Sequence, residues 1–364
     1  MRILWVNHRD PKHPEAGGAE VHLNEVCKRL VERGCQVTLL SERFPGSIQA
    51  ETLDGIDILR SGGKFDAHLY APIQVSRLGK ENDVVVDDIA HAIPWWSGLV
   101  TTRPVVGMVH HVHQSVATFQ LGRPLGVAAR MAEKTIRFSY RRIITVSETS
   151  KQQIETKLGV DPTRIRVVYH GVDHKRFGPS TEKFEEPTIL SLGRIKRYKN
   201  LEDLLLAFAL AQRQIPKLRL IIAGDGDHKS SLEETVRRLE LNNVIFVGQV
   251  GMEDKVKLLQ KSWGLCLTSS IEGWGLVLTE AAACGLPAIA YDSGATREAV
   301  IDGKTGFVVA KGNVQSLAER IVQLVRDADV RRTLSMGAIE YSQNFDWDKT
   351  ADQTLNVLSE AVNN

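Results

Sequence analysis

The fold is decided by residues 264–291, GLCLTSSIEGWGLVLTEAAACGLPAIAY. From Gly273 onward this stretch carries one charge, Glu280, over 19 residues, which is long enough for a membrane-spanning helix. Gly285 and Pro287 interrupt it, because glycine and proline end helices. The stretch therefore predicts a strand over 264–268, a glycine loop, a helix over 276–284 and a strand over 287–291.

The same alternation of short apolar strands and amphipathic helices runs through the whole chain. Regular strand–helix alternation predicts parallel sheets with helices on both faces. The expected strands of the first half are 2–6, 36–41, 56–59, 83–87, 104–109, 143–146 and 165–168. Those of the second half are 188–192, 218–223, 244–247, 264–268, 287–291 and 306–309.

The predicted fold class is α/β, with two doubly wound, Rossmann-like domains facing a cleft. A polar, turn-rich segment, HKRFGPSTEKFEEP, reads as the linker between them. Ligands of such sheets bind at the carboxyl ends of the strands. The expected parts are an N-terminal domain over 1–173, the linker over 174–187, a C-terminal domain over 188–345, and a last helix over 346–364 that packs back across the junction.

Composition excludes several classes of protein. The chain has 364 residues, 43% of them hydrophobic, and a formal net charge of +2. This mix is typical of a globular protein, and so small a charge disfavours binding to nucleic acid. The four cysteines form no C-x-x-C pair, which favours buried free thiols in a reducing compartment. The first residues have no signal-peptide pattern, so the protein is expected to be cytoplasmic.

Glycines and histidines follow the strands of the first half. Gly17 and Gly18 stand at the expected start of a helix, where backbone N–H groups and the helix dipole favour an anion. A turn that only connects strand to helix is the alternative. His110, His111 and His113 follow strand 104–109, which fits hydrogen bonding, proton transfer or a structural role. A metal site is disfavoured because no paired carboxylate motif accompanies them.

The loop after strand 188–192 is strongly cationic. Four cations lie between Arg194 and Lys199, at the start of a helix. Cations oppose the dipole of a helix at that end, so either a bound anion or a solvated loop explains them. Asp225 and Asp227 have the spacing of some metal-binding carboxylates, but their flanking glycines favour a tight turn.

The glycine loop of residues 269–275 predicts a second anion site. It leads into the helix that carries Glu280 among small apolar residues. A buried carboxylate is costly without hydrogen-bond partners, and the hydroxyls of a ligand, such as a ribose diol, would supply them.

Taken together, these motifs resemble the retaining glycosyltransferases of family 4 (glycosyl transferases group 1), which have the GT-B fold. The resemblance covers nearly the whole chain, and the spacing of Glu272 and Glu280 is its strongest mark. The motifs are GGAE at 17–20, TVSE at 145–148, HGVD at 170–173, LGRIKRYKN at 192–200, IAGDGD at 222–227, EGWGLVLTEAAACGLPAIA at 272–290, GATRE at 294–298 and DGKTGFVV at 302–309.

The resemblance implies roles for the matching residues of the C-terminal, nucleotide-sugar-binding domain. Arg194 and Lys199 would hold the donor diphosphate, Glu280 would bind the ribose, and Glu272 would face the transferred sugar. The backbone amides near Trp274, Gly275 and Leu276 would contact the sugar and phosphates. Val250 and Lys255 would belong to the loop that reads the base.

In the N-terminal, acceptor-side domain, the resemblance implies that Gly17 and Gly18 close over the diphosphate. It also implies that His110 is the active-site histidine, although His111 and His113 stand close enough to be alternatives. The sequence departs from the family at two positions, where His170 replaces the usual Asn and Cys35 the usual His. Neither change removes a catalytic group.

The implied reaction moves a hexose, mannose or glucose, from a nucleotide-diphosphate sugar to an acceptor hydroxyl with retention. Cations and helix N-termini would stabilise the leaving diphosphate, so no metal or other cofactor is expected. The sequence leaves both UDP- and GDP-linked sugars as candidate donors. By analogy with family members, GQV at 248–250 followed by Lys255 favours GDP-mannose. The alternatives are a catalytically inactive nucleotide-sugar-binding protein and a nucleotide-sugar epimerase; an oxidoreductase is disfavoured because no G-x-G-x-x-G follows the first strand.

Residues 120–142 form a basic amphipathic segment. They hold six cations and one acid, Glu133, together with several apolar side chains. Such a segment suits either the surface of an anionic membrane or a solvated helix face. Because many family members glycosylate lipid-linked acceptors, a glycan or a lipid-linked acceptor is expected, with a peripheral contact at the inner face of the cell membrane through Arg130, Lys134, Arg137 and Arg141.

Overall fold

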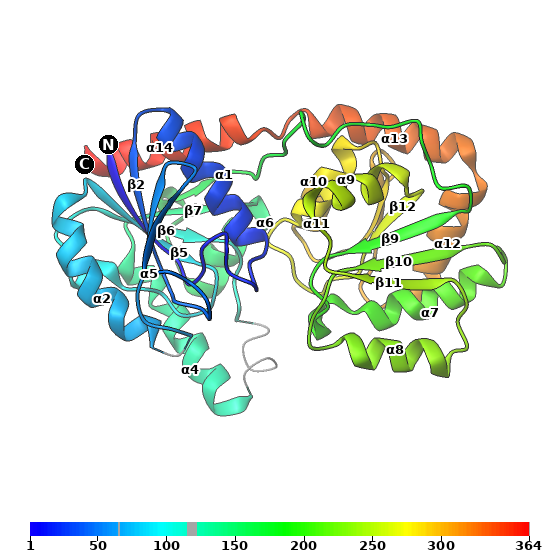
Figure 1. Cartoon of the computed structure of the whole chain (residues 1–364), viewed down its shortest axis with the longest axis horizontal. Helices are drawn as coiled ribbons and strands as arrows, with labels where there is room; N and C mark the ends of the chain where they lie inside the picture. The colour runs from blue at the N-terminus through cyan, green and yellow to red at the C-terminus, as the bar shows by residue number, and fades with distance from the viewer. Residues whose placement is uncertain (65, 115–121, 364) are drawn as a thin grey trace. The chain divides into compact units, whose positions relative to one another are not determined.

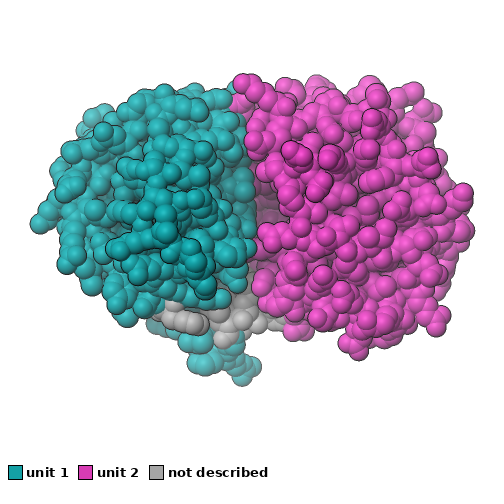
Figure 2. Space-filling view, in the orientation of Figure 1, with its two compact units in different colours: residues 1–170, 347–364 teal, residues 171–346 magenta. Residues whose placement is uncertain are grey.

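The protein is described by a computed structural model, which covers residues 1–64, 66–114 and 122–363. The chain divides into two compact units, coloured separately in Figure 2. The first unit comprises residues 1–170 and 347–364, and the second comprises residues 171–346. The segment predicted as a linker, 174–187, is grouped with the second unit.

The first unit is built on an eight-stranded sheet. The strand order is β3 (Ala50–Leu53), β4 (Ile56–Arg60), β2 (Gln36–Ser41), β1 (Arg2–Val6), β5 (Val84–Ile89), β6 (Val105–Val109), β7 (Arg142–Thr145) and β8 (Ile165–Val167). All neighbouring strands pair in parallel except β3 and β4. The helices of this unit are α1 (Gly18–Glu32), α2 (Ala67–Leu78), α4 (Arg123–Lys134), α5 (Ile136–Ser139), α6 (Glu148–Gln153) and α14 (Trp347–Val362).

The second unit is built on a six-stranded parallel sheet (Figure 1). The strand order is β11 (Val244–Gly248), β10 (Arg219–Ala223), β9 (Thr188–Leu192), β12 (Gly264–Leu267), β13 (Ala288–Tyr291) and β14 (Gly306–Val309). Its helices are α7 (Leu201–Gln212), α8 (Lys229–Arg238), α9 (Met252–Lys261), α10 (Leu276–Ala283), α11 (Thr296–Ala299), α12 (Val314–Arg326) and α13 (Ala328–Ser342).

The order of the second sheet reverses between β9 and β12. This is the topological switch point of a doubly wound sheet, where loops from neighbouring strands diverge and leave room for a ligand. The loops that follow these two strands are the cationic loop after Leu192 and the glycine loop after Leu267. The topology therefore brings together the two loops that the sequence marks as anion sites.

The α/β fold class and the parallel sheets are confirmed, but the sequence analysis missed strand β3. It is a polar, half-exposed edge strand, AETL, that pairs antiparallel with β4. Asp54 and Gly55 connect the two strands, both with positive φ. Asp-Gly is a strong signal for a hairpin turn, and this signal could have located the strand.

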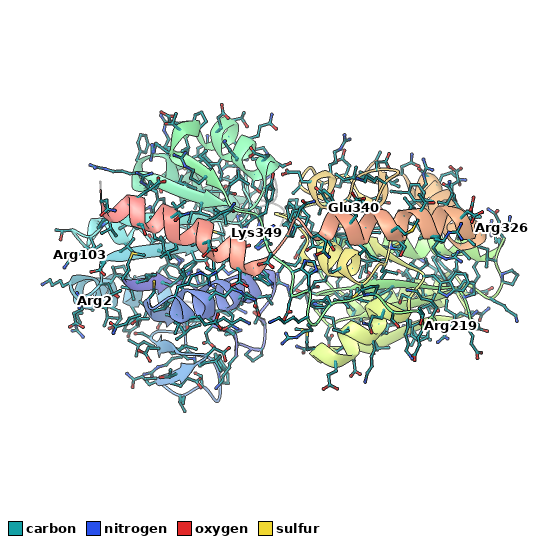
Figure 3. All side chains as sticks on the ribbon, turned by 90° about the horizontal axis from the view of Figure 1, so that it is seen from above. Arg2, Arg103, Arg219, Arg326, Glu340 and Lys349 are labelled. Atoms are coloured by element: carbon teal, nitrogen blue, oxygen red, sulfur yellow. The ribbon has the colours of Figure 1, made fainter. Side chains whose placement is uncertain are left out.

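Helix α14 belongs to the first unit although the preceding residues belong to the second. It packs beside α1, and Figure 3 shows the two helices together, with Lys349 labelled on α14. Arg33 at the end of α1 donates from Nε to Asp352 Oδ1 at 2.6 Å and from Nη2 to Asp348 Oδ1 at 3.0 Å. Thr350 Oγ1 donates to the Tyr169 carbonyl at 2.8 Å.

Two glycines of the loop after β10 have no room for a side chain. A Cβ on Gly224 would lie 1.9 Å from the Gly193 carbonyl oxygen, and one on Gly226 would lie 2.1 Å from the Ile195 carbonyl oxygen. Backbone hydrogen bonds join the same loops, from Gly193 N to Ala223 O at 2.9 Å and from Ile195 N to Asp225 O at 2.8 Å. The glycines allow this close approach of two backbones.

We predict that Gly224→Ala lowers the free energy of unfolding by at least about 2 kcal/mol, because its φ of +140° and the clash with Gly193 both oppose a Cβ. Urea unfolding measures the change. The control is Gly178→Ala, since a Cβ at Gly178 has nothing within 4 Å. Equal unfolding midpoints for the two variants would contradict the prediction.

Candidate functional site

Two loops at the switch point of the second sheet are tied together by side chains. Asn200 has a left-handed backbone and precedes α7, and its Nδ2 donates to Thr268 O at 3.1 Å and Ser270 Oγ at 2.6 Å. Thr268 Oγ1 donates to Lys199 O at 2.7 Å, and Ser270 N donates to Tyr198 O at 2.8 Å. These bonds fix the loop that carries Arg194 and Lys199 against the loop that carries Glu272.

Lys199 and Glu272 form an ion pair at this junction. The Lys199 Nζ lies 2.6 Å from Glu272 Oε1, and both side chains are largely buried. Burial on its own would lower the pKa of Lys199, but the carboxylate of Glu272 and the neighbouring Tyr198 outweigh it and hold that pKa above its usual value. Lys199 is therefore a fixed positive charge at neutral pH.

Arg194 leaves its positive charge open to a ligand. It is exposed, and within the described part of the chain no ion-pair partner lies within 4 Å of it. Lys196, by contrast, pairs with Asp227 at 2.9 Å between Nζ and Oδ2. A small pocket at the ends of β9 and β12 is lined by Arg194, Lys199 and the neighbouring Ser269, whose buried Oγ has no hydrogen-bond partner.

Helix α10 begins directly after the glycine loop. Gly275 precedes it with a φ of +86°, and a Cβ there would crowd Leu278 and Leu267. Trp274 is buried and packs edge-to-face on Phe345, with ring centroids 5.0 Å apart. Leu276 is the first helical residue and is half-buried. The structure thus places the predicted loop residues at the N-terminus of this helix.

Glu280 is buried in α10, as the sequence predicts for its apolar helix, and it has a partner that the sequence analysis missed. Its Oε1 lies 2.6 Å from Lys255 Nζ on α9, while its buried Oε2 has no hydrogen-bond partner. Lys255 also lies over the Phe177 ring, 5.4 Å from the centroid. Lys255 is therefore held by Glu280, and the half-buried Val250 lies between β11 and α9.

At the start of α1, Glu20 organises the glycine turn of the first unit. Its Oε2 accepts a hydrogen bond of 2.6 Å from the Gly17 backbone N–H. Gly18 is the first helical residue and is exposed. A carboxylate in the first turn stabilises a helix N-terminus. Because the Gly17 N–H already donates to Glu20, it is not available to a bound anion.

His110 lies at the end of β6 and is bound to Asp88 on β5. Its Nε2 is 2.8 Å from Asp88 Oδ1, and Trp5 Nε1 donates to the other carboxylate oxygen at 2.9 Å. Burial alone would lower the pKa of His110, but the charge and hydrogen bond of Asp88, with a smaller effect of Glu20, raise it above 6.5. The sequence analysis did not predict this pairing.

Two further histidines surround His110. His22 on α1 and His170 are both buried, and their Nδ1 atoms lie 2.8 Å apart. Burial lowers the pKa of both histidines well below 6.5, with added repulsion from their histidine neighbours. The His22 ring lies 5.5 Å from the His110 ring and 5.8 Å from the Trp347 ring, between centroids. His170, the departure from the family pattern, is thus part of a histidine cluster that only the fold reveals.

The alternatives to His110 have different surroundings. Glu133 of α4 is buried and accepts from the His113 backbone N–H at 2.6 Å and from Gln114 Nε2 at 2.8 Å. The His111 ring lies against the His113 ring, with centroids 4.1 Å apart. His113 is thus held against α4 through its backbone N–H and Nδ1, which both contact Glu133 Oε1. Across residues 1–64, 66–114 and 122–363 no three His, Cys, Asp or Glu side chains are grouped as metal ligands would be.

A second polar cluster lies at the carboxyl ends of β1 and β2. The buried carboxylate of Glu42 is 3.4 Å from His13 Nε2, 3.7 Å from His8 Nδ1 and 3.9 Å from Arg9 Nε. Burial, with repulsion from His68 and Arg9, lowers the pKa of His8 to about 3. Arg9 Nε and His68 Nδ1 are buried without hydrogen-bond partners. No pattern in the sequence singled out Glu42.

Comparison with known proteins assigns the family. Residues 174–341 match the model described as Glycosyl transferases group 1, and residues 16–176 match Glycosyltransferase Family 4. The D-inositol 3-phosphate glycosyltransferase of Kribbella flavida is 26% identical over 387 residues, covering 95% of this chain and 91% of the relative. The glycogen synthase of Mycobacterium tuberculosis is 26% identical over 396 residues, covering 98% and 94%.

Solved structures agree on the fold. Sucrose-phosphate synthase from Thermosynechococcus elongatus superposes with a TM-score of 0.85 at 22% identity, covering 99% of this chain and 98% of the other. HepE of Anabaena, in complex with UDP-glucose, gives 0.81 at 21% identity, covering 99% and 100%. The chain belongs to the family 4, group 1 glycosyltransferases, which have the GT-B fold. Among the described residues, no helix is both long and apolar enough to cross a bilayer.

We predict that Asp88→Asn lowers the pKa of His110, because the variant keeps a hydrogen-bonding group but removes the charge that offsets burial. Since the folded pKa of His110 lies above 6.5, the pair stabilises the protein fully below that pH, and this contribution is lost as the pH rises through the folded pKa. NMR titration of the histidine Cε1–H signals measures the shift. The control is the exposed Glu81→Gln, and an unchanged His110 titration in Asp88→Asn would contradict the assignment.

Proposed function

We propose that the protein transfers a hexose from a nucleotide-diphosphate sugar to an acceptor hydroxyl with retention of configuration. The observation that carries the proposal is the pocket at the switch point of the second sheet, lined by Arg194 and Lys199. Two cations beside a helix N-terminus suit a diphosphate. Two relatives add support, since HepE is described in complex with UDP-glucose and a further relative is a glycogen synthase.

The diphosphate binds between Arg194 and Lys199 in this proposal. Lys199 exchanges part of its contact with Glu272 for the phosphate oxygens, and Glu272 then turns to the hydroxyls of the transferred sugar. The backbone amides near Trp274, Gly275 and Leu276 add hydrogen bonds. Because the loops are tied by Asn200, the site is preorganised and needs little rearrangement as charge develops on the leaving phosphate.

Glu280 binds the ribose of the donor. Its Oε1 is held by Lys255, and its buried Oε2 lacks a partner, so a pair of ribose hydroxyls supplies the missing hydrogen bonds. Lys255 thereby acts mainly by orienting Glu280, whereas Val250 contacts the base. A guanine or a uracil fits this assignment, so the donor is GDP- or UDP-linked, carrying mannose or glucose.

The reaction proceeds without a metal in this mechanism. The bond from the sugar C1 to the leaving phosphate breaks through an oxocarbenium-like state, and Arg194, Lys199 and the amides of α10 stabilise the departing negative charge. The acceptor oxygen attacks from the same face, and its proton passes to the leaving phosphate. The roles of His110 at the sugar and of Gly17 and Gly18 at the diphosphate remain predictions from the family resemblance.

The acceptor is a glycan or a lipid-linked molecule, bound by the first unit. The cluster around Glu42 supports this placement, since Arg9 Nε and His68 Nδ1 are buried without hydrogen-bond partners, which acceptor hydroxyls would supply. D-inositol 3-phosphate glycosyltransferases are among the relatives. We place the enzyme in the cytoplasm, in peripheral contact with the inner face of the membrane. Product analysis without added acceptor separates this function from an epimerase, and absence of any turnover would favour an inactive binding protein.

Glu280→Gln is expected to weaken binding of UDP or GDP by about 10- to 100-fold, since a hydrogen bond to a charged group contributes roughly 1.5–3 kcal/mol. Isothermal titration calorimetry measures the dissociation constants of both nucleotides. The matched control, Glu253→Gln, changes an exposed carboxylate on α9. The ribose assignment is wrong if Glu280→Gln binds nucleotide as tightly as this control.

Arg194→Ala is expected to slow release of UDP from UDP-glucose, or of GDP from GDP-mannose, by about 100-fold, the effect of removing one donor to a developing charge. The control is Lys217→Ala, which removes an exposed cation that does not line the pocket. The same assay in EDTA tests the metal-free mechanism. Wild-type turnover in Arg194→Ala would remove Arg194 from the site, and loss of turnover in EDTA would require a metal.

A further inference from the structure

Helices α4 and α5 together expose four large apolar side chains. Leu125, Val127, Met131 and Phe138 have exposed fractions of 65%, 50%, 68% and 78%. Single apolar side chains are normal on a protein surface, but four within residues 125–138, on two consecutive helices, point to an interaction site. Figure 1 shows α4 projecting from the sheet of the first unit, which leaves its outer face open within that unit.

The periodicity of α4 separates a buried side from an exposed apolar side. Gly126, Ala129 and Glu133 are buried and recur at i, i+3 and i+7, so they mark the side that faces the unit. Val127 and Met131 lie at i and i+4 on the opposite side. The outermost part of the helix is therefore apolar, which is the reverse of an ordinary solvated helix.

Cations border this apolar side without a balancing exposed acid. Arg123, Arg130 and Lys134 are exposed on α4. Glu133, the one acid of the segment, is 1% exposed, and its carboxylate is used by His113 and Gln114. The one negative charge of α4 thus lies inside the unit, and the charged side chains that the helix exposes are all cations.

Helix α5 follows α4 directly and also exposes an apolar side chain, Phe138, beside a cation. Arg137 lies over the Phe138 ring, 4.5 Å from the centroid, and Arg141 beyond it is exposed. Two residues of the predicted basic segment are excluded, because Ile136 is fully buried and Arg142 pairs with Glu360 at 2.7 Å. Residues 120 and 121 of that segment lie outside the described residues.

We infer that α4 and α5 dock on an anionic lipid bilayer, with Val127, Met131 and Phe138 inserted among the lipids. Long basic side chains keep their charged ends at the headgroups while their stems cover apolar surface. An apolar side bordered by cations complements an anionic bilayer, whose negatively charged headgroups lie above an apolar layer. The inference extends the proposed membrane contact from charge attraction to insertion of named side chains.

Two forces then hold the protein on the membrane. Salt screens the attraction between the cations and anionic lipids, but it does not weaken apolar insertion. Binding is therefore expected to fall as salt rises and yet to depend on the apolar side chains at every salt concentration. A surface that acts by charge alone would not depend on them.

Co-sedimentation with vesicles tests the inference on the full-length protein. The probes are phosphatidylcholine vesicles with and without 30% phosphatidylglycerol (about one lipid in three), at low and high salt. The insertion variant is V127S/M131S/F138S, and the charge variant replaces Arg130, Lys134, Arg137 and Arg141 with Ser. The matched control is I48S/L69S/I73S, which removes three exposed apolar side chains from the same unit.

We expect the wild type and the matched control to bind the anionic vesicles equally, and the insertion and charge variants to bind at least about 10-fold more weakly. Circular dichroism and nucleotide binding verify that each variant is folded, and because the readout is sedimentation, failure here leaves the proposed glycosyl transfer untouched. The inference is overturned if the wild type does not bind at low salt, or if the insertion variant binds like the wild type. Self-association that is lost in the insertion variant, without vesicle binding, would assign the surface to a second copy instead.

Discussion

The close approach of two backbones, Gly193–Ile195 against Gly224–Gly226, is the constraint on which the second unit's site depends. Their amides and carbonyls bond directly because two positions carry no Cβ. This contact sets the path of the loop from β9 into α7. Asn200 and Thr268 then join that loop to the glycine loop after β12. The positions of Arg194, Lys199 and Glu272 therefore all depend on the loop after β10, where Gly224 and Gly226 have no room for a side chain.

The buried polar side chains described in the two units differ in charge. In the second unit the two carboxylates of the candidate site are matched with lysines, Glu272 with Lys199 and Glu280 with Lys255. Each pair keeps charge available inside the protein, where an isolated ion would be costly. In the first unit burial keeps His22 and His170 neutral, whereas the neighbouring His110, next to Asp88, gains affinity for a proton. The histidine cluster around His110 therefore contains two neutral imidazoles, whereas the candidate site of the second unit contains paired ions.

The sequence predicts the parallel sheets well because buried parallel strands are short, continuous apolar runs. The sequence does not predict β3, because this polar edge strand has no continuous apolar run. It also identifies Lys199, Glu272 and Glu280 as site candidates, since local motifs carry them. It cannot predict the pairing of His22 with His170, 148 positions apart, or the burial of Glu133, because both depend on which faces of distant elements meet. Hydrophobic periodicity records that a face is buried, not what covers it.

The placement of α14 makes the second unit an insertion within the first. Residues 171–346 are synthesised after most of the first sheet but before the helix that packs on α1 and bonds to Tyr169. Domains fold in order as the chain emerges from the ribosome, yet the first unit here lacks one of its layers until the second unit has been made. The second unit can therefore complete its core first, and the first unit's hydrophobic surface beside α1 stays uncovered during that interval.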